Sequence, residues 1–218
     1  MLTAHMAHFS TQLNYYLSFD VVECGWVEAM KRLRSDSLDS PESLLLAHSN
    51  FLQSATKHAF LHPESRVIKS QLRLLYGLLE DLQTLVEGFL RPALAEKERI
   101  DAHRARTEER IRNKMYGTNE AEEAALALAW QKFLPIVEET QTKARCLLTT
   151  YEEQMSAFLL DLCSMEDVRL QDLCIRLDIS GYYVSRDQKL RMSLTLAHRL
   201  SRGQLRLRAD HASVPSLR

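Results

Sequence analysis

The side chains in this sequence that could hold a metal ion are histidines at helical spacing. His5 and His8 lie three residues apart, and His58 and His62 lie four apart, so each pair could meet on one helix face. Neither pair has a cysteine or carboxylate that completes a metal-ligand set. His62 also precedes Pro63, where a helix should end. We therefore predict surface or interface histidines, with no metal and no cofactor.

A nucleophile for covalent catalysis would need an activating neighbour. Cys24 has Glu23 beside it and neither a base nor a positive environment that would stabilise a thiolate. The glutamate pairs at 138–139 and 152–153 are expected to face solvent. Because no catalytic constellation is found, we predict that the protein is not an enzyme.

The four cysteines form no C-x-x-C pair, and each lies among apolar residues at helical spacing. We predict reduced, partly buried thiols of an intracellular protein rather than disulfides or a zinc site. The cysteines are Cys24, Cys146, Cys163 and Cys174.

The opening residues, MLTAHMAHFS, lack the layout of a signal peptide, and no apolar run approaches the roughly 18 residues that span a bilayer.

Composition favours a helical globular protein. Of the 218 residues, 45% are hydrophobic and 26% are charged, which is ordinary for such a protein. Six glycines and five prolines are few, which favours long helices over turn-rich β architecture. The formal net charge is −1, so no global feature points to nucleic acid or to a membrane surface. We expect an all-α antiparallel bundle of long helices.

Two apolar rows at helical spacing follow residues 2–33, which predicts one helix covered on more than one side. One row is Leu2, Met6, Phe9, Leu13 and Tyr16; the other is Tyr15, Phe19, Val22, Trp26, Met30 and Leu33. A second helix is predicted over 41–61, because Ser40-Pro41-Glu42 provides an N-cap and a proline at the first helical position. It should bury Leu44, Ala47, Phe51, Leu52 and Ala55.

The third and fourth helices carry the longest heptad patterns. Apolar residues over 68–89 and 130–162 alternate steps of three and four, which is typical of helices packed against a partner helix. Pro92 should kink or interrupt the third helix, and Pro135 should bend the fourth, which is expected over about 120–163. We predict that the two form an antiparallel pair.

The segments around and after this pair are less regular. Residues 95–123 are charged and predict a solvated helical extension with a flexible loop near Gly117; interleaved glutamates argue against a nucleic-acid-binding arm. A short helix is expected over about 166–177, and residues 190–196 alternate as a short strand would. The basic tail, 199–218, is predicted to be disordered.

The first helix carries more aromatic residues than one buried face needs. Phe9, Tyr15, Tyr16, Phe19 and Trp26 exceed a single packing seam. Some of this surface should therefore be covered by elements outside this sequence or by a protein partner.

Three stretches match motifs of one family in the same order. Residues 8–26, HFSTQLNYYLSFDVVECGW, meet every lettered position of H-F-x-x-x-x-x-Y-Y-x-x-F-x-V-x-E-x-x-W, and residues 47–52, AHSNFL, look like A-H-x-x-F-L. The third stretch is residues 169–183, which resemble L-R-F-L-x-x-R-L-D-F-N-x-x-Y; as a close follower of this motif, residues 186–194 meet R-x-x-x-L-R-x-S-L. These are motifs of the γ-tubulin complex component family, which the sequence resembles over about residues 1–196.

The resemblance implies a non-catalytic scaffold for microtubule nucleation. Family members have an amino-terminal helical domain that packs laterally and a carboxy-terminal one that binds γ-tubulin. The expected partners are γ-tubulin and other complex components, in the cytoplasm and cytoskeleton, at microtubule-organising centres and spindle poles. This sequence matches only the later part of the carboxy-terminal domain: residues 1–198, with a charged insert at about 95–123, followed by a flexible tail at 199–218.

The closing motif supplies the candidate γ-tubulin-binding residues, because arginine and tyrosine at an exposed element end are apt for contact. They are Arg169, Arg176, Asp178, Tyr182 and Tyr183. The alternative for Arg176 and Asp178 is that they bridge to neighbouring helices. Where the motif has Phe-Asn, this sequence has Ile179-Ser180, which changes the chemistry of the loop. An alternative for the whole chain is a helical-bundle adaptor that binds coiled-coil partners.

Overall fold

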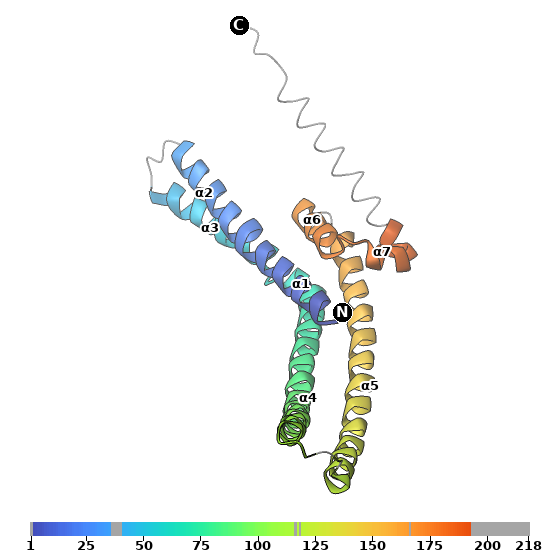
Figure 1. Cartoon of the computed structure of the whole chain (residues 1–218). Helices are drawn as coiled ribbons and strands as arrows, with labels where there is room; N and C mark the ends of the chain where they lie inside the picture. The colour runs from blue at the N-terminus through green and yellow to red at the C-terminus, as the bar shows by residue number, and fades with distance from the viewer. Residues whose placement is uncertain (1, 36–40, 116, 118, 166, 193–218) are drawn as a thin grey trace. The chain divides into compact units, whose positions relative to one another are not determined.

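The computed structural model describes residues 2–35, 41–115, 117, 119–165 and 167–192, and the regular secondary structure within those ranges is entirely helical (Figure 1). The all-α prediction is therefore confirmed. In chain order the elements are α1 (Leu2–Tyr15), η1 (Tyr16–Glu23), α2 (Cys24–Ser35), α3 (Pro41–His58), η2 (Pro63–Ser65), α4 (Arg66–Arg112), α5 (Glu120–Ser164), α6 (Val168–Leu177) and α7 (Tyr182–Arg186).

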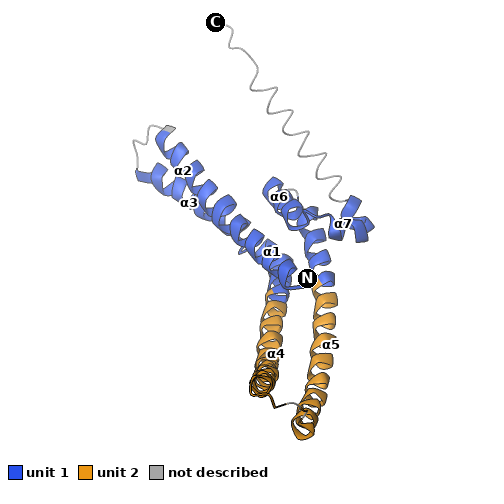
Figure 2. Cartoon of the chain, viewed as in Figure 1, with its two compact units in different colours: residues 1–75, 152–218 blue, residues 76–151 orange. Residues whose placement is uncertain are grey.

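The chain divides into two compact units (Figure 2). Unit 1 comprises residues 1–75 and 152–218, and unit 2 comprises residues 76–151. Unit 1 contains α1 to α3, α6, α7 and the adjoining ends of α4 and α5. Unit 2 is a helical hairpin made from the remaining parts of α4 and α5.

The first helix of unit 1 changes its winding in the middle. It runs unbroken from Leu2 to Ser35, but η1 is a π-helix, which closes i→i+5 hydrogen bonds and so adds about one residue to a turn. Buried positions step from Leu13 to Tyr16 and then to Val21, five residues further on. The first apolar row, apart from half-buried Leu2, is therefore core, as predicted.

The second apolar row of this helix is largely exposed. Phe9 is 1% exposed, whereas Phe19 is 40% exposed, although both belong to the same helical stretch. Tyr15, Val22 and Trp26 are also exposed. This agrees with the expectation that the aromatic surplus exceeds what the chain itself covers.

The core of unit 1 joins α1 to the ends of α5 and α6. The Phe9 and Phe158 rings meet edge to face with centroids 6.0 Å apart, and Tyr16 stacks on Phe60 at 5.8 Å. Leu159 and Leu173 have no exposed surface. Burial of these large side chains supplies the main stabilisation of the unit.

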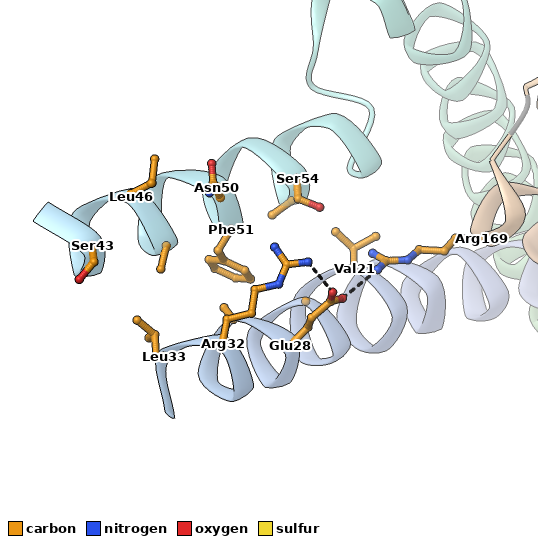
Figure 3. Close-up of a pocket in the computed structure, with 14 residues that line it drawn as sticks. Val21, Glu28, Arg32, Leu33, Ser43, Leu46, Asn50, Phe51, Ser54 and Arg169 are labelled. Carbon is orange, nitrogen blue, oxygen red and sulfur yellow. Dashed lines mark hydrogen bonds and ion pairs between the residues drawn. The ribbon is translucent and has the colours of Figure 1, made fainter. Parts of the chain in front are cut away.

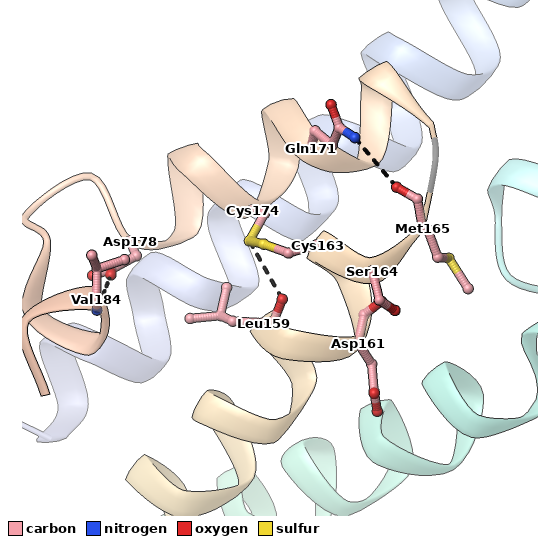
Figure 4. Close-up of a disulfide and its surroundings, with 9 residues drawn as sticks. All are labelled: Leu159, Asp161, Cys163, Ser164, Met165, Gln171, Cys174, Asp178 and Val184. Atoms are coloured by element: carbon pink, nitrogen blue, oxygen red, sulfur yellow. Dashed lines mark hydrogen bonds between the residues drawn. A yellow bond between two sulfur atoms is a disulfide. The ribbon is translucent and has the colours of Figure 1, made fainter. Parts of the chain in front are cut away.

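A disulfide links the end of α5 to α6 (Figure 4). Cys163 and Cys174 are bonded and buried, and Sγ of Cys174 lies 3.5 Å from the carbonyl oxygen of Leu159. The prediction of four reduced, partly buried thiols is therefore wrong. The two free cysteines, Cys24 and Cys146, are exposed. α5 ends at Ser164, and α6, which begins at Val168, folds back against it, so that the two cysteines are paired.

The second helix is less buried than its periodicity predicts. α3 ends at His58 rather than near 61, and none of its residues is fully buried. Leu44 and Leu52 are exposed; Ala47, Phe51 and Ala55 are only half-buried. α3 lies against α2 and η1, so one side of it is covered and the remaining apolar residues face outward.

Unit 2 confirms the predicted pairing of the two long helices. The Phe89 ring of α4 stacks on Phe133 of α5 with centroids 6.0 Å apart, and Arg110 forms an ion pair with Glu122 near the turn. α4 continues through Pro92 and into the charged segment, and α5 continues through Pro135. The charged segment is thus partly a helical extension, as predicted, and Gly117 in the connection has a φ of 140°.

The end of the described chain is helical rather than extended. Residues 188–192 are helical, so the strand-like alternation predicted over 190–196 is wrong for 190–192. The rest of that stretch and the tail at 199–218 lie outside the described residues. Within the described residues, no helix combines the length and the apolar character that crossing a bilayer requires.

Candidate protein-binding surface

The sequence-predicted site residues lie on α6, α7 and the turn between them, all in unit 1. α6 begins at an N-cap: the Asp167 carboxylate accepts a hydrogen bond from the backbone N–H of Arg169 at 2.9 Å. α7 begins after Gly181, whose φ of 68° lies in the left-handed region that glycine adopts without strain. These two positions define where α6 and α7 begin.

Asp178 holds the turn together from inside. Its Oδ1 accepts from the N–H of Tyr183 at 3.1 Å, and its Oδ2 accepts from the N–H of Val184 at 2.8 Å. Only 7% of Asp178 is exposed. Because its carboxylate caps the first turn of α7, Asp178 positions the site and offers little surface to a partner.

Arg176 ties the closing motif to the first helix. Its guanidinium donates to the Asp20 carboxylate and lies over the Tyr15 ring, 5.1 Å from the centroid. Its carbonyl oxygen accepts from His8 Nε2 at 3.0 Å. Asp20 belongs to the π-helix, so Arg176 is paired with the part of the first helix whose winding is wider.

The two tyrosines differ in their surroundings. Tyr183 is buried, and its ring meets Tyr182 edge to face at 5.2 Å. The Tyr182 hydroxyl donates to Glu152 Oε1 at 2.5 Å, and the Arg186 guanidinium lies 4.4 Å from its ring centroid. This hydrogen bond to Glu152 raises the pKa of Tyr182. Glu152 was expected to face solvent. It instead accepts the hydrogen bond from Tyr182 and forms an ion pair with Arg186, with a 2.8 Å separation between Arg186 Nη1 and Glu152 Oε2.

Arg169 is the arginine of the motif with the weakest hold within the chain. Its Nη2 lies 3.9 Å from Glu28 Oε2, beyond hydrogen-bond distance, and Oε1 of Glu28 already accepts from Arg32 at 2.7 Å. Ile179, at the turn before α7, is 77% exposed. Sequence reasoning treated Ile179 only as a departure from the motif, and its exposure depends on a turn that periodicity does not reveal.

A histidine joins the end of α3 to the start of α6. His58 Nε2 lies 2.9 Å from Asp167 Oδ2, and His58 Nδ1 lies 2.7 Å from the Ser54 carbonyl oxygen. Both ring nitrogens face acceptor oxygens, so the imidazole links α3 to the residue that caps α6. The Tyr16 hydroxyl donates to the His58 carbonyl oxygen at 3.0 Å, and burial raises the pKa of Tyr16 above its usual range. His58 is thus a structural residue and not a surface histidine.

A groove runs between α2 and α3 (Figure 3). It encloses a cavity of about 320 Å³ whose one wall includes Val21 of η1 and Ala29 of α2, and whose other wall includes Ala47 and Phe51 of α3. Phe51 lies close to the backbone of α2, because a Cβ added at Gly25 would come within 3.3 Å of its ring. Arg169 reaches one end of the groove from α6.

The three sequence motifs meet around this groove. Val21 of the first motif, Phe51 of the second and Arg169 of the third all line it, and the Trp26 ring meets Phe51 edge to face at 5.6 Å. Amphipathic helices that leave apolar residues exposed beside a charged, capped turn define an interaction module.

Comparison with known proteins identifies the family of this module. The family model described as gamma tubulin complex component C-terminal matches residues 1–183. The chain is 30% identical over 195 residues to gamma-tubulin complex component 3 homolog of Xenopus laevis, and 29% identical over 195 residues to gamma-tubulin complex component 3 of Homo sapiens. A third relative, gamma-tubulin complex component 3 of Drosophila melanogaster, is 30% identical over 204 residues.

These matches cover 89%, 89% and 91% of this chain, but 21% of each relative. The chain belongs to the gamma-tubulin complex component family. The resemblance found in the sequence motifs is therefore confirmed, and the matched relatives are component 3 proteins. The chain spans about a fifth of the length of those relatives.

Proposed function

We propose that this chain is a γ-tubulin-binding, non-catalytic scaffold segment of the γ-tubulin complex. The observation that carries the proposal is the family match over residues 1–183, with the three motifs meeting on one side of unit 1. In this role it supports microtubule nucleation at microtubule-organising centres and spindle poles, in the cytoplasm and cytoskeleton. Its partners are γ-tubulin and other complex components; no nucleic acid, membrane or cofactor takes part.

In domain terms, the proposal assigns residues 1–198 to part of the carboxy-terminal domain. Residues 95–123 are its charged insert, and residues 199–218 are its basic tail. The apolar residues that α2 and α3 expose outside the groove, such as Val27 and Leu45, agree with a domain whose remaining helices would cover them.

The γ-tubulin contact is proposed for the α6–α7 segment. Arg169, Ile179 and Tyr182 supply the contacting side chains, because they are accessible and combine a cation, an apolar tip and an aromatic ring. Arg176, Asp178 and Tyr183 act mainly by positioning them, since these residues are held by Asp20, the α7 N-terminus and the unit 1 core.

Co-expression of the full chain with γ-tubulin, followed by gel filtration and a quantitative pull-down, tests this proposal. We expect a stable complex, and at least tenfold weaker capture when Ile179→Asp is combined with Tyr182→Ala, because hot-spot truncations cost about 2 kcal/mol or more. The matched control is Leu61→Asp, which places the same charge on an exposed leucine outside the segment. Equal capture by both variants would move the contact elsewhere, and no complex with the unmodified chain would refute the function.

A helical-bundle adaptor for coiled-coil partners is a second candidate, favoured by unit 2. Between α4 and α5 lies an open cavity of about 580 Å³ lined by apolar residues that include Leu85, Phe89 and Leu147. A third helix packed in register could occupy it. Pull-down of coiled-coil proteins that is lost with Phe89→Asp, without γ-tubulin capture, would favour this function.

A further inference from the structure

The groove between α2 and α3 combines an apolar floor with one charged end. Its lining repeats every three or four residues on both helices, over 21–33 and 43–55, so two helix faces run along it for about 18 Å. The small side chains of Ala29 and Ala47 leave the space that Leu46 and Phe51 border, and Gly25 makes room for the Phe51 ring. A cavity of about 320 Å³ of this kind accommodates inserted apolar side chains.

The charge at the α6 end of the groove is unbalanced toward the positive. The charged residues that line the groove are Glu28, Arg32 and Arg169. Glu28 accepts a 2.7 Å hydrogen bond from Arg32, while the Arg169 guanidinium stays 3.9 Å from the same carboxylate. Arg169 therefore keeps donors that can take a second carboxylate in the bidentate geometry that arginine favours.

We propose that this groove binds an acidic amphipathic helix of a partner protein, in addition to the capture of γ-tubulin, with which it shares only Arg169. Apolar side chains at i and i+4 of that helix enter between Ala47 and Ala29, and a carboxylate near one end pairs with Arg169. A helix fits better than an extended strand, because both walls are helices with side chains at three- and four-residue spacing and offer no free sheet edge. The positive charge selects for an acidic rather than a basic helix.

A selection experiment on the full chain tests the proposal. A phage library of helical peptides of about 16 residues, with leucines fixed four positions apart and the other positions randomised, is panned against the chain. Enriched peptides are then labelled with fluorescein, and their binding is measured by fluorescence anisotropy. We expect enrichment of Glu and Asp near one end of the peptide.

Two substitutions in the groove should each raise the Kd of the enriched peptides at least tenfold. Ala47→Trp fills the floor, and Arg169→Glu reverses the charge at the end. Leu45→Trp introduces the same side chain at an α3 position that lies outside the groove and whose leucine is 68% exposed, and it should leave the Kd unchanged. Replacing the terminal Glu of the peptide by Gln should weaken binding to the unmodified chain and abolish the effect of Arg169→Glu.

Circular dichroism confirms that each variant is folded; if Ala47→Trp unfolds, Asn50→Trp blocks the groove from its exposed rim. Enrichment of neutral or basic peptides would overturn the proposal. So would equal binding of the peptides to the unmodified and the blocked chain, or enrichment on the unmodified chain no greater than on the blocked chain. Displacement of the peptide by inorganic phosphate alone, with no dependence on the leucines, would indicate a simple anion site and would also overturn it. Capture of γ-tubulin is measured separately on Ala47→Trp and is expected to be unchanged.

Discussion

α1 and α3 are both amphipathic helices of unit 1, yet they are used differently. Three residues of α1 are buried in the core, whereas none of α3 is. α1 lies against α6, and Phe9 packs on Phe158 of α5, while α3 rests on α2 and η1 and leaves Leu44, Leu45 and Leu46 exposed. An apolar periodicity indicates which face of a helix is hydrophobic. That face is buried only where another element is present to cover it.

The largest expected effect is on the α1 side. Phe9→Ala should lower the free energy of unfolding by about 3–5 kcal/mol, because it removes a fully buried ring and leaves a cavity against Phe158. Urea denaturation followed by circular dichroism measures it. Phe19→Ala, on the exposed row of the same stretch, is the matched control and should cost less than about 1 kcal/mol. Similar shifts for both variants would erase the distinction between the two rows.

The next largest effect concerns the bond that joins α5 to α6. Cys163→Ser should lower the free energy of unfolding by about 3 kcal/mol, because the cross-link closes a short loop and the lost sulfur is buried. Thermal unfolding with and without a reductant measures the same effect on the unmodified chain. Cys24→Ser changes an exposed free thiol and should leave the melting temperature unaltered. Insensitivity of the unmodified chain to reductant would show that the bond is dispensable.

A smaller effect is expected at the capped turn. Asp178→Ala should cost about 1–2 kcal/mol, because it removes the carboxylate that accepts from the N–H groups of Tyr183 and Val184. Amide hydrogen exchange should become faster in α7, while α1 stays protected. Asp178→Asn keeps an acceptor oxygen and should recover part of the loss; failure of that recovery would argue that charge rather than capping matters.

The smallest effect is expected on α3. Leu45→Ser should change the free energy of unfolding by no more than about 0.5 kcal/mol, because the side chain is mainly in water. Self-association measured by light scattering should fall, since an exposed apolar side chain is removed. A loss above about 2 kcal/mol would mean that this face of α3 is covered in solution, and the contrast with α1 would disappear.

Much of the fold follows from local sequence signals. The heptad steps over 68–89 and 130–162 predicted α4 and α5, and Pro41 after Ser40 predicted the start of α3. The buried row ending at Tyr16 was also predictable, because its steps of three and four match an α-helix. These features depend on neighbours a few residues apart, which a single sequence displays directly.

The misses depend on long-range geometry. Cys163 and Cys174 meet because α6 folds back on α5, and their spacing in the sequence carries no signal of that return. The partners of Arg176, Asp20 and His8, lie more than 150 residues away in the sequence. Within the candidate site, residue types alone led to the prediction of this segment, but which side chains cap, bridge or face outward is decided by a turn at Gly181.

The π-helix between Tyr16 and Glu23 has a consequence for how the chain tolerates insertions and deletions. Each residue advances an α-helix by about 100°, so an extra residue that the winding did not absorb would rotate α2 by about that angle relative to α1. Losing one residue from the π-helix would restore uniform winding and leave the azimuth of α2 nearly unchanged, because the wider turn already absorbs about one residue. Gaining a further residue as α-helix would instead turn Ala29 away from α3 and redirect Trp26. The π-helical turn thus compensates for one extra residue between α1 and α2 and keeps their apolar faces aligned.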